Sequence, residues 1–274
     1  MAVIDGRKIA SKIISGLKTE VAALPFRPLF CDVLIGQDPV SQSYIRIKGR
    51  TAKSVGLDFH TVLLPEDTKP EAVLEKIREL NLQPNIRGLI IQLPVPEDFN
   101  QQKLLDAIEP KFDVDCMGSV NLKAFYQGHP CFLPPTAAAI LKILDTLPVD
   151  ISTKEILVIG QGDLVGKPVS FLLKQRGLLV NVADRSTPDI LELMRRADII
   201  ISATGQPKLI TGDKIKYGSI IVDAGTAETN AGIVGDVDFD SVNKVAGMVS
   251  PVPGGVGPVT VAMLLSNVVK AAKK

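Results

Sequence analysis

The sequence predicts a two-domain α/β protein built on parallel sheets, and three observations support this prediction. Short apolar runs alternate with segments of helical periodicity along nearly all of the 274 residues, which is the pattern of βαβ units. Four proline or glycine residues fall within residues 128–135 (GHPCFLPP), and this composition marks a crossover between domains. A strand at 155–160 then runs through a glycine-rich turn into a helix. The second domain is therefore predicted to be of Rossmann type.

The first half of the chain predicts a helix followed by alternating strands and helices. Ile9, Ile13, Leu17 and Val21 recur every four residues and indicate a helix over 7–23. Further helices are predicted at 39–55, around 73–80 and around 104–108, and strands at 29–36, 58–65 and 87–94. A loop at 111–121 (KFDVDCMGSVN) follows.

The second half repeats this alternation. Thr136 is predicted to cap a helix that runs through Leu147. A last helix is expected over roughly 259–273. The apolar runs predict strands at 155–160, 178–184, 197–205 and 219–226.

Composition narrows the classes of function. A net charge of +1 gives no electrostatic reason to expect nucleic acid or an anionic membrane as a partner. No apolar run is long enough to cross a membrane, and the N-terminus does not resemble a secretory signal. Three cysteines without a CxxC pair, and only two histidines, argue against disulfides and a metal site. We therefore expect a cytoplasmic protein with no bound metal.

The glycine turn at 160–166 (GQGDLVG) predicts a dinucleotide site. Gly160, Gln161, Gly162, Val165 and Gly166 lie between a strand and a helix, where backbone N–H groups can hold a diphosphate. The GxGxxxG spacing is weak alone, and its strand–turn–helix context strengthens it. The residues that end the two later strands are also expected to contact the cofactor: Ala203, Thr204, Gly205, Gly225 and Thr226.

The choice between NAD and NADP rests on the residues after the second Rossmann strand. Asp184, 24 residues after Gly160, suits the ribose hydroxyls of NAD, whereas Arg185, Ser186 and Thr187 suit the 2′-phosphate of NADP. Asp184 or Ser186 capping the next helix is a structural alternative. The residues leave the choice open, and we favour NADP.

Polar residues in the first domain suggest a catalytic site. Tyr44 and Lys48 lie four residues apart, on one face of the predicted helix. Gln92 interrupts a buried apolar strand, and Asp115 lies in a loop. A buried amide needs hydrogen-bond partners, and open α/β sheets place ligand contacts at the carboxyl ends of strands. Each residue alone also fits a structural role: a helix-surface pair, a core amide and a turn carboxylate.

Three motifs in this order resemble the bifunctional methylenetetrahydrofolate dehydrogenase/methenyltetrahydrofolate cyclohydrolase family. They are S-x-x-Y-x-x-x-K at 41–48, QLPVP at 92–96 and PVPGGVGP at 251–258, and the likeness covers essentially the whole chain. The resemblance implies domains at 1–134 with 258–274 and at 135–257, because the C-terminal helix returns to the first domain. It also implies a folate cleft between the domains and a homodimer.

The resemblance also assigns roles to residues. It implies that Tyr44 stacks on the folate, that Lys48 polarises the substrate and handles protons, and that Gln92 holds Lys48. Asp115 would hydrogen-bond the pterin ring. Further folate contacts are implied for Leu93, Pro94, Gly254, Gly255, Gly257 and Pro258.

The resemblance implies oxidation of 5,10-methylenetetrahydrofolate with NADP, followed by hydrolysis of the methenyl product to 10-formyltetrahydrofolate. The chain departs from the family around the nucleotide: G-R-S is replaced by residues 160–162 (GQG), and H-S-R-T by residues 184–187 (DRST). Two further departures are Cys116 in DVDC and residues 134–137 (PPTA). The alternatives are a monofunctional dehydrogenase that uses NAD or NADP, a reductase of a cyclic hydroxy acid, and a non-catalytic folate or dinucleotide sensor.

Overall fold

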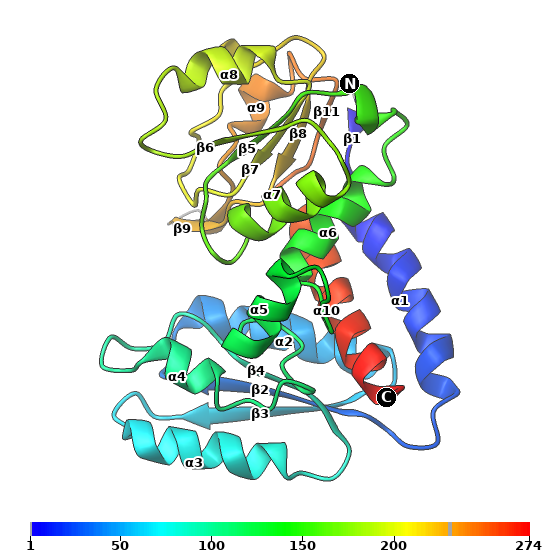
Figure 1. Cartoon of the computed structure of the whole chain (residues 1–274), viewed down its shortest axis with the longest axis vertical. Helices are drawn as coiled ribbons and strands as arrows, with labels where there is room; N and C mark the ends of the chain where they lie inside the picture. The colour runs from blue at the N-terminus through cyan, green and yellow to red at the C-terminus, as the bar shows by residue number, and fades with distance from the viewer. Residues whose placement is uncertain (1, 230–231) are drawn as a thin grey trace. The chain divides into compact units, whose positions relative to one another are not determined.

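A computed structural model describes residues 2–229 and 232–274 of the chain (Figure 1). The chain divides into two compact units, which we call the six-stranded unit (Met1–Ser11 and Thr136–Thr260) and the three-stranded unit (Lys12–Pro135 and Val261–Lys274). The start of the chain, which was predicted to lie in the N-terminal domain, clusters with the six-stranded unit, and Ala2 and Val3 pair with Met248 and Val249 of its sheet.

The three-stranded unit is a parallel βαβαβ arrangement. Strand β2 (Leu29–Ile35) lies between β3 (Asp58–Leu64) and β4 (Ile86–Ile91). Helix α2 (Pro39–Ser54) connects β2 to β3, and α3 (Pro70–Asn81) connects β3 to β4. The two helices lie on opposite faces of the sheet (Figure 1). The sequence predicted all five elements to within about three residues at each end.

Alternation along β2 sends its side chains to two different surroundings. Cys31, Val33 and Ile35 belong to a core cluster with Ile77 of α3. Successive side chains of a strand point to opposite faces. Asp32 therefore faces the side of the sheet that α2 covers.

The remaining helices of this unit are shorter or shared with the six-stranded unit. Helix α4 (Gln101–Leu105) ends before Ile108, which was predicted to belong to it. Helix α5 (Ser119–Tyr126) was not predicted. Helices α1 (Gly6–Ala22) and α10 (Val256–Ala272) begin in one unit and end in the other.

The prediction that the C-terminal helix returns to the first domain is confirmed. Asn267 of α10 donates from Nδ2 to the carbonyls of Val114 and Leu133, at 2.8 and 2.9 Å. All three residues belong to the three-stranded unit.

The six-stranded unit has a Rossmann-type parallel sheet in the order β1-β11-β8-β7-β5-β6. The chain goes from β5 to β6 on one side and then to β7 on the other, so a topological switch point lies between β5 and β7. Ligands of open α/β sheets bind outside the carboxyl ends of the strands at such a point. The strands are β1 (Ala2–Val3), β5 (Ile156–Ile159), β6 (Val180–Ala183), β7 (Ile199–Ser202), β8 (Ile220–Asp223) and β11 (Met248–Val249).

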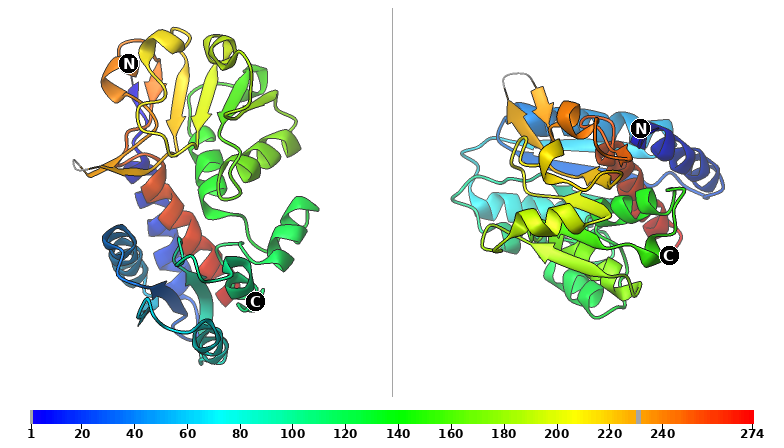
Figure 2. Two further views of the ribbon diagram at one scale, coloured as in Figure 1. Left: turned by 90° about the vertical axis from the view of Figure 1, so that its left-hand side faces the viewer. Right: turned by 90° about the horizontal axis from the view of Figure 1, so that it is seen from above.

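Helices and a hairpin complete this unit. An antiparallel hairpin of β9 (Ala227–Thr229) and β10 (Gly232–Val234) projects from it (Figure 2). Two short 3₁₀ turns lie at Ile151–Thr153 and Gly212–Lys214. The helices are α6 (Pro135–Leu144), α7 (Gly166–Gln175), α8 (Ile190–Arg196) and α9 (Phe239–Val242).

Three predicted helix ends in this half of the chain are wrong. Helix α6 begins at Pro135, so Thr136 lies inside its first turn and does not cap it, and the helix ends three residues before Leu147. Proline is well suited to the first turn of a helix, because its N–H would have no intrahelical partner there. Helix α10 begins at Val256 rather than near residue 259.

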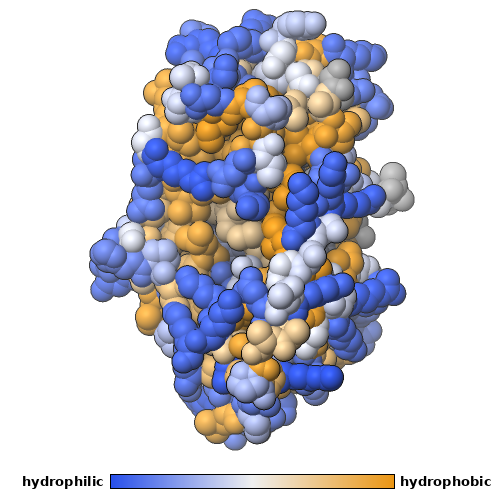
Figure 3. Space-filling view, turned by 90° about the vertical axis from the view of Figure 1, so that its right-hand side faces the viewer, coloured by the Kyte–Doolittle hydropathy of each residue, from blue (hydrophilic) through white to orange (hydrophobic). Residues whose placement is uncertain are grey.

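The surface is mixed in character. Hydrophilic and hydrophobic residues are interspersed over the face shown in Figure 3. Among the described residues, no helix is both long and apolar enough to span a bilayer.

Candidate functional site

Helix α2 places Tyr44 and Lys48 one turn apart. The helix begins at Pro39, and the Asp38 side chain caps it by accepting a hydrogen bond from the Ser41 N–H at 2.7 Å. The i, i+4 spacing puts the two side chains on the same face. Burial raises the pKa of the half-buried Tyr44 hydroxyl. The Tyr–Lys pair predicted from the sequence therefore lies on a helix that is fixed at its start.

The Lys48 ammonium has two polar partners. It donates to Gln92 Oε1 at 2.7 Å and lies 2.6 Å from Asp32 Oδ2. Gln92 was predicted to interrupt a strand, but it directly follows the end of β4. Its N–H extends the β-ladder by donating to the Val33 carbonyl at 2.8 Å. The amide can therefore reach Lys48 from the carboxyl end of the strand.

Asp32 is a site residue that our sequence reasoning missed. Its side chain is fully buried, and within the described residues it has no polar partner other than Lys48. Burial raises the pKa of Asp32, and the nearby Lys48 ammonium opposes that rise. The available signal was a carboxylate in the middle of an otherwise apolar strand, LFCDVLI.

Asp115 lies near this pair and is half-buried. Burial raises its pKa to about 6, the Lys48 ammonium opposes the rise, and the charges of Asp113 and Asp32 add to it. The structure thus places Gln92 and Asp115 near the Lys48 ammonium, and adds Asp32 to them. A carboxyl group with a pKa near neutrality beside an amine can take part in proton transfer and in binding polar ligands.

The loop that carries Asp115 is organised by its neighbour Asp113, which the sequence reasoning did not select. The Asp113 carboxylate accepts hydrogen bonds from the Met117 and Gly118 N–H groups, at 3.1 and 2.9 Å, and from Asn121 Nδ2 at 3.0 Å. The first carboxylate of DVDC therefore holds the loop, and the second is left to face Lys48.

Of the other predicted folate contacts, two lie beside Gln92 and four lie in the six-stranded unit. Gln92 Nε2 donates to the Leu93 carbonyl at 3.0 Å, and Pro94 follows in an exposed position. The four residues in the six-stranded unit belong to the turn at the start of α10, where the Gly255 carbonyl contacts Gly6. They are Gly254, Gly255, Gly257 and Pro258.

The glycine turn after β5 has two glycines that packing requires and one that it does not. Gly160 has φ +94°, and a Cβ there would overlap the Ala203 carbonyl, while a Cβ on Gly166 would overlap the Gly160 carbonyl. A Cβ on Gly162 would meet no heavy atom of the described residues within 4 Å. Gly162 thus leaves open space at the turn, as a bound dinucleotide requires.

Helix α7 begins at this turn and can hold an anion. Its N-cap, Val165, provides no side-chain hydrogen bond. The Lys167 N–H donates to the Gly162 carbonyl at 3.1 Å and Pro168 has no N–H, so Gly166 supplies the first-turn N–H that a ligand can use. Gln161 Nε2 donates to the Gly160 carbonyl at 2.9 Å and so stays within the turn. These residues fit the diphosphate of a dinucleotide.

The residues that follow β6 form hydrogen bonds with one another. Asp184 Oδ1 accepts hydrogen bonds from the N–H and the hydroxyl of Ser186, at 2.9 and 2.7 Å, and these contacts lower the pKa of Asp184. Helix α8 has Asp189 at its N-cap, so neither Asp184 nor Ser186 caps it. With its amide oriented to pair with Arg185, Gln206 accepts from Nε and Nη2 of that exposed side chain, each at 2.9 Å.

Two buried carboxylates that the sequence reasoning missed support the predicted cofactor residues after β7 and β8. Asp236 Oδ2 accepts hydrogen bonds from Ser202 Oγ at 2.6 Å and from the Thr204 N–H at 2.7 Å. Asp223 Oδ1 accepts from the Gly225 N–H at 2.9 Å. Burial, with the Asp236 charge, raises the pKa of Asp223 to about 7. Gly205 and the exposed Thr226 follow directly in the chain.

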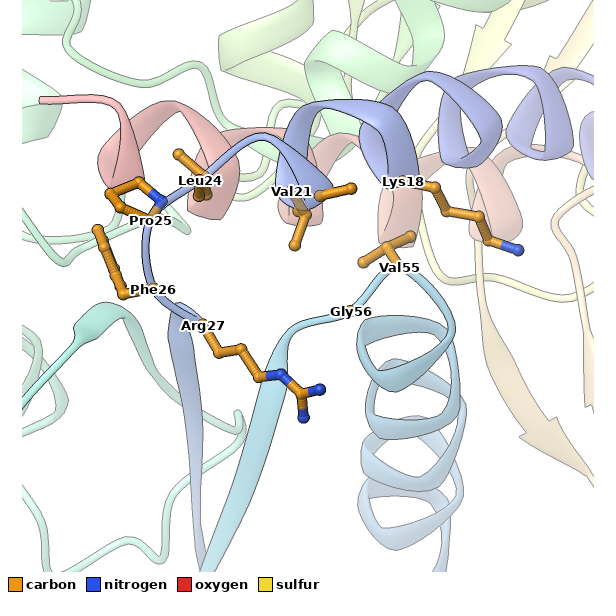
Figure 4. A pocket seen from close by; sticks show the side chains of 9 residues that line it. Lys18, Val21, Leu24, Pro25, Phe26, Arg27, Val55 and Gly56 are labelled. Atoms are coloured by element: carbon orange, nitrogen blue, oxygen red, sulfur yellow. The ribbon is translucent and has the colours of Figure 1, made fainter.

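A surface hollow of about 380 Å³ in the three-stranded unit lies away from these residues (Figure 4). The end of α1, the loop to β2 and the α2–β3 turn line it, with Arg27 and Gly56 just before the starts of β2 and β3. Gln92, by contrast, follows the carboxyl end of β4. The hollow therefore lies at the opposite end of the strands and is not part of the Lys48 cluster.

Comparison with known proteins gives a consistent result over the whole chain. The bifunctional protein FolD of Exiguobacterium sibiricum is 40% identical over 274 residues, which cover 99% of both chains. The crystal structure of the bifunctional FolD from Campylobacter jejuni has a TM-score of 0.94 and 34% identity, covering 100% of this chain and 99% of that one. The Trypanosoma brucei FolD, solved with NADP and an inhibitor, has a TM-score of 0.94 and 37% identity, covering 100% of this chain and 97% of that one.

Two family models match, and they divide the chain in the order that the fold shows. Residues 4–115 match the catalytic domain of tetrahydrofolate dehydrogenase/cyclohydrolase, and residues 134–274 match its NAD(P)-binding domain. The Lys48 cluster lies in the first match and the glycine turn in the second. The chain belongs to the tetrahydrofolate dehydrogenase/cyclohydrolase family.

Proposed function

We propose that this chain oxidises 5,10-methylenetetrahydrofolate to the 5,10-methenyl form with NADP, and then hydrolyses that product to 10-formyltetrahydrofolate. The observation that carries the proposal is the Lys48 ammonium, held by Gln92 and Asp32 with Asp115 beside it, within the catalytic-domain match. Membership of the family and the bifunctional relatives support both steps.

The glycine turn after β5 and the start of α7 would hold the diphosphate of NADP, and Arg185 would meet its 2′-phosphate. NADP held there would supply the nicotinamide ring that takes up a hydride from the one-carbon bridge of the folate. The protein contributes alignment of the two reactants and exclusion of competing reactions. We assign the contacts beyond the turn to Ala203, Thr204, Gly205, Gly225 and Thr226.

The folate would be held by the residues around Lys48. We assign stacking on the folate to Tyr44 and a hydrogen bond to the pterin ring to Asp115, with Leu93 and Pro94 as neighbouring contacts. Gly254, Gly255, Gly257 and Pro258 are proposed to contact the rest of the folate.

Hydrolysis requires a group that moves protons. Water adds to the bridging carbon of the methenyl cation and loses one proton, which gives a carbinol. The bond from that carbon to N5 then breaks as N5 takes a proton and the carbinol hydroxyl loses one to become the formyl oxygen. One proton is released overall. Lys48 is the group we assign to this transfer, because a donor within hydrogen-bond reach of the reacting atoms is what general acid–base catalysis needs.

Turnover of methylenetetrahydrofolate with NADP and with NAD, in parallel, tests the whole assignment. The expected result is formation of the reduced nicotinamide, faster with NADP, together with accumulation of 10-formyltetrahydrofolate. A reaction that stops at the methenyl form would show a monofunctional dehydrogenase. No turnover with either cofactor would contradict the proposal.

We also propose that the chain is a homodimer that works in the cytoplasm. The three unpaired cysteines and the family support this proposal. Light scattering of the purified protein at two concentrations measures the mass of the assembly, and a monomer at both would contradict the dimer.

A further inference from the structure

The strongest unexplained feature is the carboxylate of Asp32 in the centre of the three-stranded sheet. Its side chain is fully buried on the middle strand, β2, and its Oδ2 lies 2.6 Å from Lys48 Nζ. Taking a carboxylate out of water costs several kcal/mol unless a partner compensates it. Among the described residues Lys48 is the only polar partner that Asp32 has.

The geometry around Lys48 Nζ shows what this partner does. An ammonium has three N–H donors. One is directed to the Gln92 amide oxygen at 2.7 Å, and the Asp32 carboxylate forms an ion pair with Nζ at 2.6 Å, so a donor remains for a ligand. The two partners come from β2 and from the end of the adjacent β4. Nζ is thus fixed from two points of a rigid sheet.

The charges around Asp32 show which group can compensate it. The titratable groups that interact with Asp32 are Lys48 of α2, Cys31 on the same strand and Asp115 from the loop after β4. Of these three only Lys48 is cationic, so its ammonium is the charge that compensates the buried carboxylate.

We propose that Asp32 is a positioning residue for hydrolysis of the methenyl folate, which fixes Lys48 Nζ and holds it as an ammonium. This inference rests on the proposed function. The ammonium gives a proton to N5 as the carbon–N5 bond breaks, and the hydroxyl of the carbinol returns a proton to the amine. The lysine therefore ends the step as it began.

Hydride transfer, by contrast, needs no proton from Lys48. The two steps should respond differently to loss of the Asp32 charge. Asp32→Asn removes the charge and keeps the shape of the side chain. Asp32→Leu also removes the charge and places an apolar side chain, which suits a buried strand. Asp58→Asn is the matched control, because Asp58 is an exposed carboxylate at the start of the neighbouring strand β3.

The rates of both steps would be measured across pH for the wild type and the three variants. We expect both Asp32 variants to lose hydrolysis by at least about tenfold, a fraction of the roughly 10²–10⁴-fold that a positioned proton donor contributes. Hydride transfer should persist, and the basic limb of the hydrolysis profile should move to lower pH. Asp58→Asn should behave as the wild type does.

A second readout does not depend on turnover. Lys48 should react faster with acetic anhydride in the Asp32 variants, because only the neutral amine is acylated, and exposed Lys53 on the same helix serves as the internal reference. Peptide mass spectrometry measures both rates.

Equal loss of both steps, with a wild-type pH profile and unchanged Lys48 acetylation, would overturn the role of Asp32 and indicate a structural effect. A wild-type enzyme without turnover would instead overturn the proposed function. The two failures are therefore distinguishable.

Discussion

Removing the amine of Lys48 should destabilise the protein in a way that depends on pH. In Lys48→Met the fully buried Asp32 carboxylate loses the ammonium that lies 2.6 Å from it. Breaking one side of a buried ion pair typically costs about 3–5 kcal/mol, because the remaining charge is uncompensated.

Protonation sets an upper limit to this cost. In the variant, Asp32 can take up a proton and so avoid carrying an unpaired charge. Keeping a carboxyl group with an unfolded pKa of about 3.9 protonated at pH 7 costs about 4 kcal/mol of folding free energy. At pH 5 the same limit is only about 1.5 kcal/mol. The Lys48 ammonium opposes the rise that burial causes in the Asp32 pKa, so without it the pKa rises further and the folded variant keeps the extra proton. Stability of the variant relative to the wild type therefore falls as the pH rises above the folded pKa of Asp32 in the wild type.

Urea denaturation followed by circular dichroism, at pH 5 and pH 7, measures this difference. The double variant Asp32→Leu/Lys48→Met is the control, since replacing both members of a buried pair with apolar residues is often neutral or stabilising by about 1–4 kcal/mol. We expect the double variant to recover wild-type stability at pH 7. A single variant as stable as the wild type at both pH values would refute the pairing of Asp32 with Lys48.

The cofactor site yields three further predictions. Gly160→Ala should lower the free energy of unfolding by more than about 2 kcal/mol, because φ is +94° and the added methyl group meets a backbone carbonyl. Gly162→Ala should leave the free energy of unfolding in urea unchanged and raise the Kd for NADP. Arg185→Ala should reduce the NADP-to-NAD ratio of kcat/KM by about tenfold or more, and an unchanged ratio would remove Arg185 from the 2′-phosphate site. Burial and the Asp236 charge raise the pKa of Asp223 to about 7, so stability falls as the pH rises from about 4 to about 7. Asp236→Asn should therefore raise the melting temperature at pH 8 and give no gain at pH 5.

The fold could be predicted because its elements have clear periodicities. Strands β2 and β5 are apolar runs bounded by breakers, and α3 repeats apolar residues at helical spacing. Helix α5 was missed because its first residues, Ser119–Asn121, continue a polar loop whose hydrogen bonds come from Asp113. Strand β1 is too short to have a period, and its pairing with β11 joins the two ends of the chain.

The site could be predicted only where motifs mark it. Lys48 and Gln92 lie in recognisable motifs, and their hydrogen bond is what the resemblance implies. Asp32 lies in no motif. In the sequence, one carboxylate within an apolar strand departs from the expected pattern without indicating a function. Its meaning depends on α2 bringing Lys48 over that face of the sheet, a tertiary contact that periodicity does not encode.

The two carboxylates near Lys48 should act on the proposed reaction in opposite senses. In the group formed by Lys48, Asp32 and Asp115, the ammonium balances the Asp32 carboxylate. Above a pH of about 6 the Asp115 carboxylate is therefore the uncompensated charge. A negative charge stabilises the cation that forms on the one-carbon bridge and therefore favours hydride loss. The same charge slows the loss of that cation to water. The ammonium that Asp32 holds repels the cation and offers a proton to N5, so it favours hydrolysis. The balance between the two activities should then depend on which of these carboxylates is ionised, not on Lys48 alone.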